Sequence, residues 1–153
     1  MATRGFEFAY MLDGSNATPL IRDVVLGVAA AHKVGDLMQV QADGFVDHTA
    51  GSIDEVTCIM MEAVAAADIT AGTTTAKAAI ITNQQVWRCS TDATTAATAL
   101  FGTVKTWDAV DANTIDADDV SNGSMIVWDT SELDDEGNVI GYVVFSDTTF
   151  GHA

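Results

Sequence analysis

The stretch TIDADDVSNG, residues 114–123, places Asp116, Asp118 and Asp119 within four positions and ends in an Asn-Gly turn. Carboxylates this close together are typical of calcium loops, which need oxygen ligands at positions one, three and five, glycine at six and glutamate at twelve. Counted from Asp116 or from the acidic cluster 134–136, the sequence lacks both the glycine and the glutamate. We therefore predict a solvated turn, because turns use the same residues. A looser calcium site stays open if the two acidic loops meet.

Histidine and cysteine offer other metal or catalytic chemistry. His32, His48 and His152 are far apart in the sequence, and none forms a short-spaced pair with another histidine or a cysteine. We expect surface or half-buried histidines and no zinc site or catalytic imidazole. Cys58 and Cys89 lie among apolar or β-branched neighbours, which favours buried free thiols. No metal or other cofactor is predicted.

The sequence also lacks the common enzyme motifs. There is no Gly-x-Ser-x-Gly, and the segment TAGTTTAK, residues 70–77, lacks the second glycine and the Gly-Lys-Ser/Thr ending of a phosphate loop. Chance pairs of carboxylates are frequent in so acidic a chain, and Trp87, Trp107 and Trp128 fit strands better than sugar platforms. We predict that the protein is not an enzyme.

Charge is distributed unevenly along the 153 residues. The net charge is -16, with 22 acidic residues against 6 basic ones, and Lys105 is the last basic residue. This charge disfavours binding of DNA or RNA by an exposed face, since contacts to phosphates need Lys and Arg. The chain after Lys105 predicts an anionic, strongly solvated surface. The start MATRGFEFAYMLDG lacks the apolar run of a signal peptide and no window suits a membrane span, so we expect synthesis in a cytoplasm and no membrane association.

The elements that position these residues are mostly strands. Residues 1–25 combine the alternating FEFAY with a turn-forming LDGSNATP, which predicts an N-terminal arm or edge strand. Residues 26–153 are expected to form a single β-rich domain. Within it, LMQVQ and FVDH flank Ala-Asp-Gly, a hairpin signal. The segment 24–34 is evenly balanced between helix and strand, and 52–64 favours a buried strand over an amphipathic helix.

Further strands are predicted for AAIIT, QVWRCST, FGTVKTWDAV, NGSMIVWDT and NVIGYVVF, each bounded by turn residues. The Ala-rich segment 92–100 begins with an N-capping aspartate and predicts one short helix. The fold class expected is mostly β, a small β-barrel or sandwich with one or two short helices.

The chain contains, in order, the segments VGDLMQVQADGFVDHTAGS, MEAVAAAD, KAAIIT, NQQVWRCSTD and the later GTVKTWDAV to GYVVF. This organisation resembles that of small head proteins of tailed bacteriophages, particularly capsid decoration or cement proteins. The resemblance covers residues 34–147 and rests on pattern. It implies a compact β-tulip-like or barrel-like domain on the outer surface of an icosahedral capsid. Such proteins commonly form homotrimers that bind junctions between major capsid subunits and stabilise the shell.

The resemblance also implies an interface. An N-terminal arm that adds a strand to a capsid subunit would use TRGFEFAYML, with Phe6, Phe8 and Tyr10 as anchors, although an ordinary edge strand within the domain remains an alternative. The basic residues Arg4, Arg22 and Arg88 would pair with capsid carboxylates. Acidic residues after Lys105 would face outward, and a saline habitat would favour the same charge.

Two other classes of function stay open. A phage tail tube subunit or other minor virion protein would share the β-rich composition. A non-viral binding module or a small enzyme is the third class. The localisation expected from the first class is the virion, on the outer capsid surface.

Overall fold

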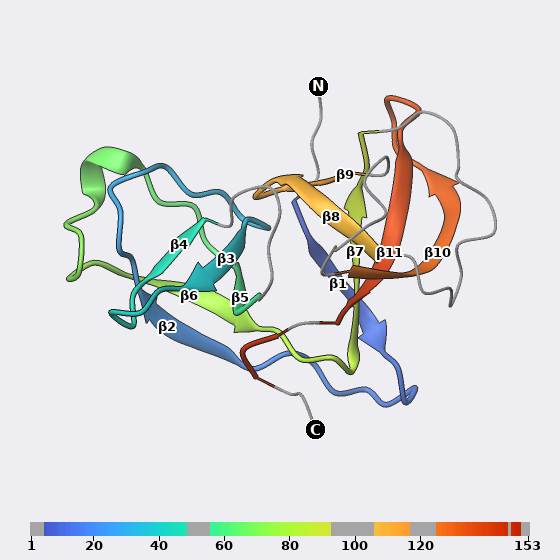
Figure 1. The fold of residues 1–153 in the computed structure, drawn as a ribbon, viewed down its shortest axis with the longest axis horizontal. Helices are drawn as coiled ribbons and strands as arrows, with labels where there is room; N and C mark the ends of the chain where they lie inside the picture. Colours follow the sequence, from blue (N-terminus) through green and yellow to red (C-terminus); the bar gives the residue numbers. More distant parts are fainter. Residues whose placement is uncertain (1–4, 49–55, 93–105, 117–124, 147, 151–153) are drawn as a thin grey trace.

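The computed structural model describes residues 5–48, 56–92, 106–116, 125–146 and 148–150, with only the backbone described within 106–111. Two antiparallel sheets lie next to each other along the long axis of the molecule (Figure 1). The strands are β1 Glu7–Met11, β2 Ile21–Val25, β3 Leu37–Val40, β4 Val46–His48, β5 Cys58–Met60, β6 Thr75–Ile80, β7 Gln85–Ser90, β8 Thr106–Asp111, β9 Thr114–Asp116, β10 Met125–Leu133 and β11 Val139–Phe145.

The five-stranded sheet has the order β2-β6-β5-β3-β4. Its β3–β4 hairpin forms as predicted, because Gly44 takes the positive φ of 86° that a tight reversal demands. Val40 pairs with Val46 and Met38 with His48. The predicted buried strand of segment 52–64 is also confirmed in β5, whose three residues are all buried.

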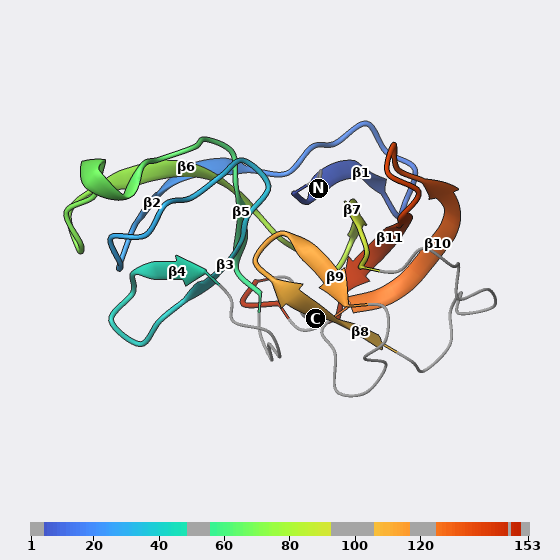
Figure 2. The same ribbon diagram turned by 90° about the horizontal axis from the view of Figure 1, so that it is seen from above.

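Both faces of the five-stranded sheet are apolar. Leu37, Ile59 and Ala79 face the core that the two sheets share. Met38 and Met60 belong instead to a second cluster, which Leu26, Val46 and Ile69 complete from the surrounding strands and loops. The sheet curls so that its border strands β2 and β4 approach each other (Figure 2). One parallel bridge, Leu26 to Val46, joins the two borders.

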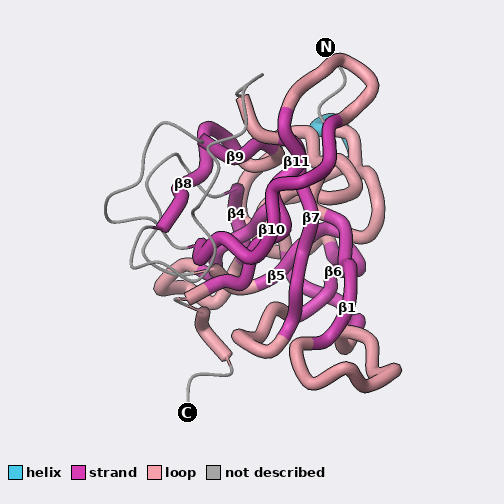
Figure 3. The backbone as a smooth tube through the Cα atoms, turned by 90° about the vertical axis from the view of Figure 1, so that its right-hand side faces the viewer, coloured by secondary structure: helices cyan, strands magenta, loops and turns pink. Residues whose placement is uncertain are grey.

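The six-stranded sheet has the order β1-β7-β11-β10-β8-β9. Figure 3 shows β7, β11 and β10 beside one another on this side of the molecule. Trp87 on β7, Met125 on β10 and Phe145 on β11 point to the shared core, as does Phe6 just before β1. The segment predicted as an arm or edge strand is thus an edge strand of the domain, because β1 pairs with β7.

The mostly β, sandwich-like prediction is confirmed, and the barrel alternative is not, since neither sheet closes. In the described part of the chain there is no α-helix and one 3-10 turn, Ala66–Asp68. The segment 24–34, for which the sequence favoured neither helix nor strand, forms the end of β2 and then a loop. The helix predicted for 92–100 falls outside the described residues except for Asp92. None of the described elements is a helix long and apolar enough to cross a lipid bilayer.

Candidate functional site

Two histidines and one aspartate converge at the five-stranded sheet. His32 Nδ1 lies 2.8 Å from His48 Nε2, which lies 2.7 Å from Asp36 Oδ2. His32 and Asp36 are each only 3% exposed, whereas the His48 side chain is 30% exposed. Among the described residues these three form a group whose ligand atoms all lie within 4.8 Å of one another, close enough to share a metal ion.

Three separate segments hold these side chains. His32 belongs to the loop between β2 and β3, where an antiparallel bridge with Val64 fixes its backbone through hydrogen bonds of 2.9 and 3.0 Å. His48 ends β4, opposite Met38. Asp36 lies in the turn before β3, and its Oδ2 accepts a hydrogen bond of 2.9 Å from the Lys33 backbone N–H.

Gly35 fixes the turn that carries Asp36. Its φ is 92°, and a Cβ at this position would lie 2.6 Å from the Cα of Gly5. The Phe6 backbone N–H donates to the carbonyl oxygen of Gly35 over 2.8 Å. Because Phe6 leads into β1, this contact couples the turn to the six-stranded sheet, and only glycine satisfies both the backbone angle and the space.

Burial and hydrogen bonding set the protonation states of the cluster. Burial lowers the pKa of His32 below its ordinary value, and the neighbouring His48 lowers it further. Burial alone would raise the pKa of Asp36, but hydrogen bonds from His48 and from the Lys33 backbone outweigh it, so the net pKa lies below its ordinary value. A neutral imidazole and an ionised carboxylate both present lone pairs, as metal ligands require.

The sequence suggested scattered histidines, and for His32 and His48 the structure corrects this interpretation. They are 16 residues apart, but strand pairing brings them into contact. One signal was available, because the hairpin predicted from LMQVQ and FVDH brings the end of its second strand, His48, near the start of its first strand, which Asp36 precedes. His32 had no such local signal. His152 lies outside the described residues.

Arg88, one of the predicted capsid contacts, is engaged within the chain. Its guanidinium pairs with Glu7 on β1 at 3.2 Å and with Glu132 on β10 at 2.6 Å. It also lies 5.7 Å from the centre of the Tyr142 ring, and the Tyr142 hydroxyl donates to Glu132 over 2.6 Å. This ladder crosses four neighbouring strands, so Arg88 already has two acidic partners.

The other predicted capsid contacts separate into two groups. Phe6 is buried in the shared core, and half-buried Phe8 packs edge-on against Trp87 with ring centroids 5.6 Å apart. These two side chains stabilise the domain itself. Tyr10 on β1 and Arg22 on β2 are exposed. Arg4 lies outside the described residues.

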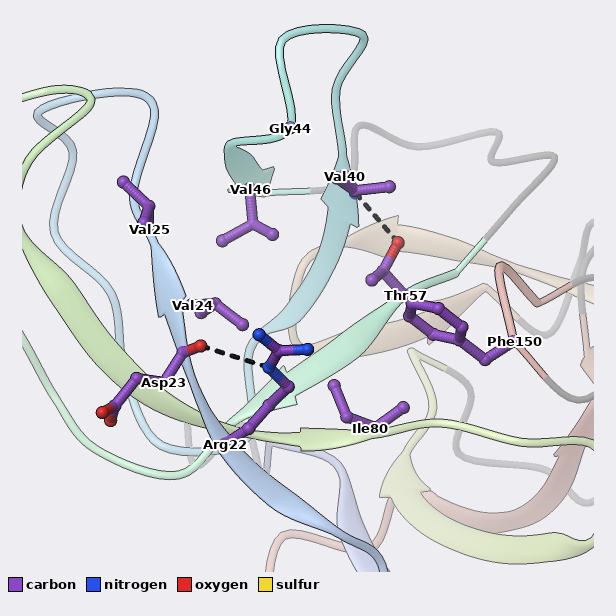
Figure 4. Close-up of a pocket in the computed structure, with 10 residues that line it drawn as sticks. All are labelled: Arg22, Asp23, Val24, Val25, Val40, Gly44, Val46, Thr57, Ile80 and Phe150. Atoms are coloured by element: carbon purple, nitrogen blue, oxygen red, sulfur yellow. Dashed lines mark hydrogen bonds between the residues drawn. The ribbon is translucent and has the colours of Figure 1, made fainter.

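Arg22 stands at an opening between the borders of the five-stranded sheet. A cavity of about 210 Å³ lies where β2 and the β3–β4 hairpin diverge from the Leu26–Val46 bridge. In Figure 4 the Arg22 side chain points from β2 toward the centre of this cavity, with Phe150 on the far side. We call this opening the seam; it is lined by Arg22, Asp23, Val24, Val25, Val40, Gly44, Val46, Thr57, Ile80 and Phe150.

The remaining candidate residues have structural roles where the structure describes them. Asp134 is buried, and its Oδ1 accepts backbone hydrogen bonds of 2.9 Å from Glu136 and Asn138, the turn geometry that the sequence suggested. Asp118 and Asp119 lie outside the described residues, so the looser calcium site stays untested. Cys58 and Cys89 are buried free thiols, as predicted, and burial raises the pKa of Cys58 to about 12.

The chain was compared with models of protein families, with curated proteins and with solved structures, and none of the three comparisons found a match.

Proposed function

We propose that this chain is a structural virion protein, which decorates the outer surface of an icosahedral phage capsid and stabilises it at junctions between major capsid subunits. The observation that carries the proposal is β2, the strand with which the described part of the five-stranded sheet ends on one side. Outer backbone groups of a border strand are available for pairing with another chain, and here they adjoin exposed apolar side chains.

Two adjacent exposed apolar side chains stand at this border. Leu20 is 70% exposed and Ile21 is 44% exposed, and both belong to the entry into β2. Val28 and Val34, in the loop that follows β2, are also exposed. Isolated exposed apolar residues are ordinary, but adjacent ones at the border strand of a sheet are typical of a protein interface.

The seam supplies a pocket beside the same strand. Its floor is mainly aliphatic, and Arg22 is the basic residue that lines it. We expect an extended segment of the capsid subunit to pair with β2 and to place one apolar side chain in the seam. A carboxylate next to that side chain, on the same capsid segment, would form an ion pair with Arg22. The acidic residues after Lys105 would then face away from the shell and repel other particles. A homotrimer is the assembly expected on the capsid.

The proposal is tested with empty, expanded capsids assembled from the major capsid protein of the same genome. Wild-type protein should bind at a fixed stoichiometry and raise the melting temperature of the shell, because it binds the folded assembly. The double variant Leu20→Asp with Ile21→Asp should bind at least about 10-fold more weakly, since it introduces charge where apolar area is buried.

The control is Leu133→Asp, which introduces one negative charge, half of the change in the double variant, at an apolar residue that is 57% exposed on β10, away from the seam. It should bind capsids as well as wild type does. Failure of wild-type protein to bind at micromolar concentration would refute the proposal. Rings or tubes formed by the protein alone, seen in negative stain, would favour a tail subunit instead.

A further inference from the structure

We propose that His32, Asp36 and His48 form a binding site for one divalent transition-metal ion of the zinc type. The ligand atoms are His32 Nδ1, Asp36 Oδ2 and His48 Nε2. Imidazole nitrogens with a carboxylate oxygen are a usual donor set for zinc, and three protein ligands leave a fourth position for water. The half-exposed side of His48 gives solvent and metal access to the site.

The convergence of the three atoms is the first argument. His48 Nε2 faces both His32 Nδ1 at 2.8 Å and Asp36 Oδ2 at 2.7 Å. A ring nitrogen has either one proton or one lone pair, so it serves two acceptors only by sharing its proton. If His48 Nε2 is unprotonated, its lone pair faces that of the carboxylate. A cation at the centre would accept all three lone pairs at once.

Charge is the second argument. Asp36 is only 3% exposed, and the negative charge of so deeply buried a carboxylate needs a positive charge or hydrogen bonds nearby. Within the described part of the chain, its ion-pair partner is His48, which is a cation only when protonated. A divalent ion would neutralise the carboxylate while both imidazoles remain neutral.

Space for the ion requires the three ligand atoms to move from their hydrogen-bonded positions. Zinc with bonds of about 2.0–2.1 Å in a tetrahedral arrangement separates its ligand atoms by about 3.3 Å. His48 Nε2 must therefore move about half an ångström farther from His32 Nδ1 and from Asp36 Oδ2, while these two atoms, which lie within 4.8 Å of each other, must come to rest about 3.3 Å apart. His48 is at the end of β4 and partly exposed, so its ring has room to rotate. The bound ion would fasten the β3–β4 hairpin to the loop between β2 and β3.

The backbone around the site is already prepared. The Lys33 backbone N–H holds Asp36 Oδ2, and the Val64 bridge holds the His32 backbone. A hydrogen bond to a ligating side chain, such as the one from Lys33 to Asp36, orients a metal ligand before the ion arrives, and its loss typically costs 10–100-fold in affinity. None of the three ligands lines the seam, and zinc binding is measured on the protein without capsids, so the two proposals are tested separately.

The test uses full-length protein without a histidine tag, treated with a chelator and then titrated with zinc chloride in a calorimeter. Wild-type protein should bind one zinc ion per chain, and zinc at 100 times its dissociation constant should raise Tm by about 5 °C or more. His48→Gln and Asp36→Asn should each weaken zinc binding at least about 100-fold, because a direct ligand contributes more than its hydrogen-bond partners do. Cobalt(II) should give the visible absorption of a tetrahedral site.

The control variant His152→Gln should bind zinc as wild type does. Because Asp36 is buried, unfolding of each metal-free variant is measured first. If Asp36→Asn does not fold, the test rests on His48→Gln, since the His48 side chain is partly exposed. Absence of zinc, cobalt and nickel binding to folded wild-type protein would overturn the proposal. Equal zinc binding by folded His48→Gln and wild type would also overturn it.

Discussion

The two sheets differ in what their outer faces do. The six-stranded sheet covers the shared core with one face and carries the Glu7, Arg88, Tyr142 and Glu132 ladder, in which Arg88 pairs with both glutamates. The five-stranded sheet is apolar on both faces, ends at β2 on one side in the described part of the chain and holds the His32, Asp36 and His48 cluster. The candidate binding features therefore lie on the five-stranded side, while Arg88 on the six-stranded side already has two acidic partners.

The largest expected effect tests whether both apolar clusters are true cores. Met38 belongs to the second cluster and Met125 to the shared core, and both are fully buried. Met38→Ala and Met125→Ala should each reduce the free energy of unfolding by about 2–5 kcal/mol, because each leaves a cavity. Urea unfolding measures both. A loss below about 1 kcal/mol for Met38→Ala alone would mean that the second cluster is only loosely closed.

The next effect tests the contact that joins the two sheets. Gly35→Ala places a methyl group 2.6 Å from the Gly5 backbone and keeps a positive φ, whereas Gly44→Ala has the positive φ but no atom within 4 Å. Gly44→Ala should cost about 1–2 kcal/mol for the backbone angle, and Gly35→Ala about 1–3 kcal/mol more for overpacking. Thermal unfolding measures both. Equal losses of stability in the two variants would show that the backbones of Gly5 and Gly35 can move apart at no cost.

Asp134 gives a smaller effect with a defined pH dependence. Burial alone would raise its pKa, but hydrogen bonds from Ser90 and from the backbone of Asn138 and Glu136 lower it below the ordinary 3.8. Its stabilisation is present above the unfolded-state pKa and is lost as pH falls through the lower folded-state pKa. Asp134→Ala should therefore cost about 1–3 kcal/mol at pH 7 and less at pH 3.

The matched control for this variant is Asp135→Ala, because Asp135 is the exposed neighbour on the same turn. A surface substitution should change stability by no more than about 0.5 kcal/mol at either pH. Urea unfolding at both pH values measures the pair of variants. If Asp134→Ala loses as much stability at pH 3 as at pH 7, the carboxylate is not the stabilising group.

The smallest expected effect on stability concerns Arg88, which is compared with Arg22 because both were predicted to contact the capsid. Arg88→Met should reduce stability by no more than about 1 kcal/mol, since its acidic partners are half exposed and salt screens such pairs. It should leave capsid binding unchanged. Arg22→Met should weaken capsid binding by several-fold, because Arg22 lines the seam. Equal capsid binding by the two variants would contradict the assignment of the interface to β2.

Local signals explain which parts of the fold could be predicted from the sequence. The hairpin around Gly44 follows from an Asp-Gly turn between two apolar runs, and β5 from an apolar run with no helical spacing. The curl of the five-stranded sheet depends on pairing between residues such as Leu26 and Val46, which no local pattern specifies. Sheet order was unpredictable for the same reason.

The functional residues follow the same division. The resemblance implied that Arg22 contacts a capsid carboxylate, and the structure leaves Arg22 exposed beside a cavity that the sequence could not reveal. Phe6 was expected to anchor a partner, but its alternation with Phe8 reflects packing in the shared core. His32 reaches His48 only because the loop after β2 bridges to Val64, a contact between residues 32 positions apart.

Hydrogen exchange tests most directly the claim that binding is concentrated on the five-stranded side. Amide exchange is measured by mass spectrometry on the free protein and on protein bound to expanded capsids. Peptides covering Leu20 to Val28 should become protected on the capsid, while peptides from β10 and β11 should exchange at the same rate in both samples. Protection confined to β10 and β11, with none at β2, would contradict the account.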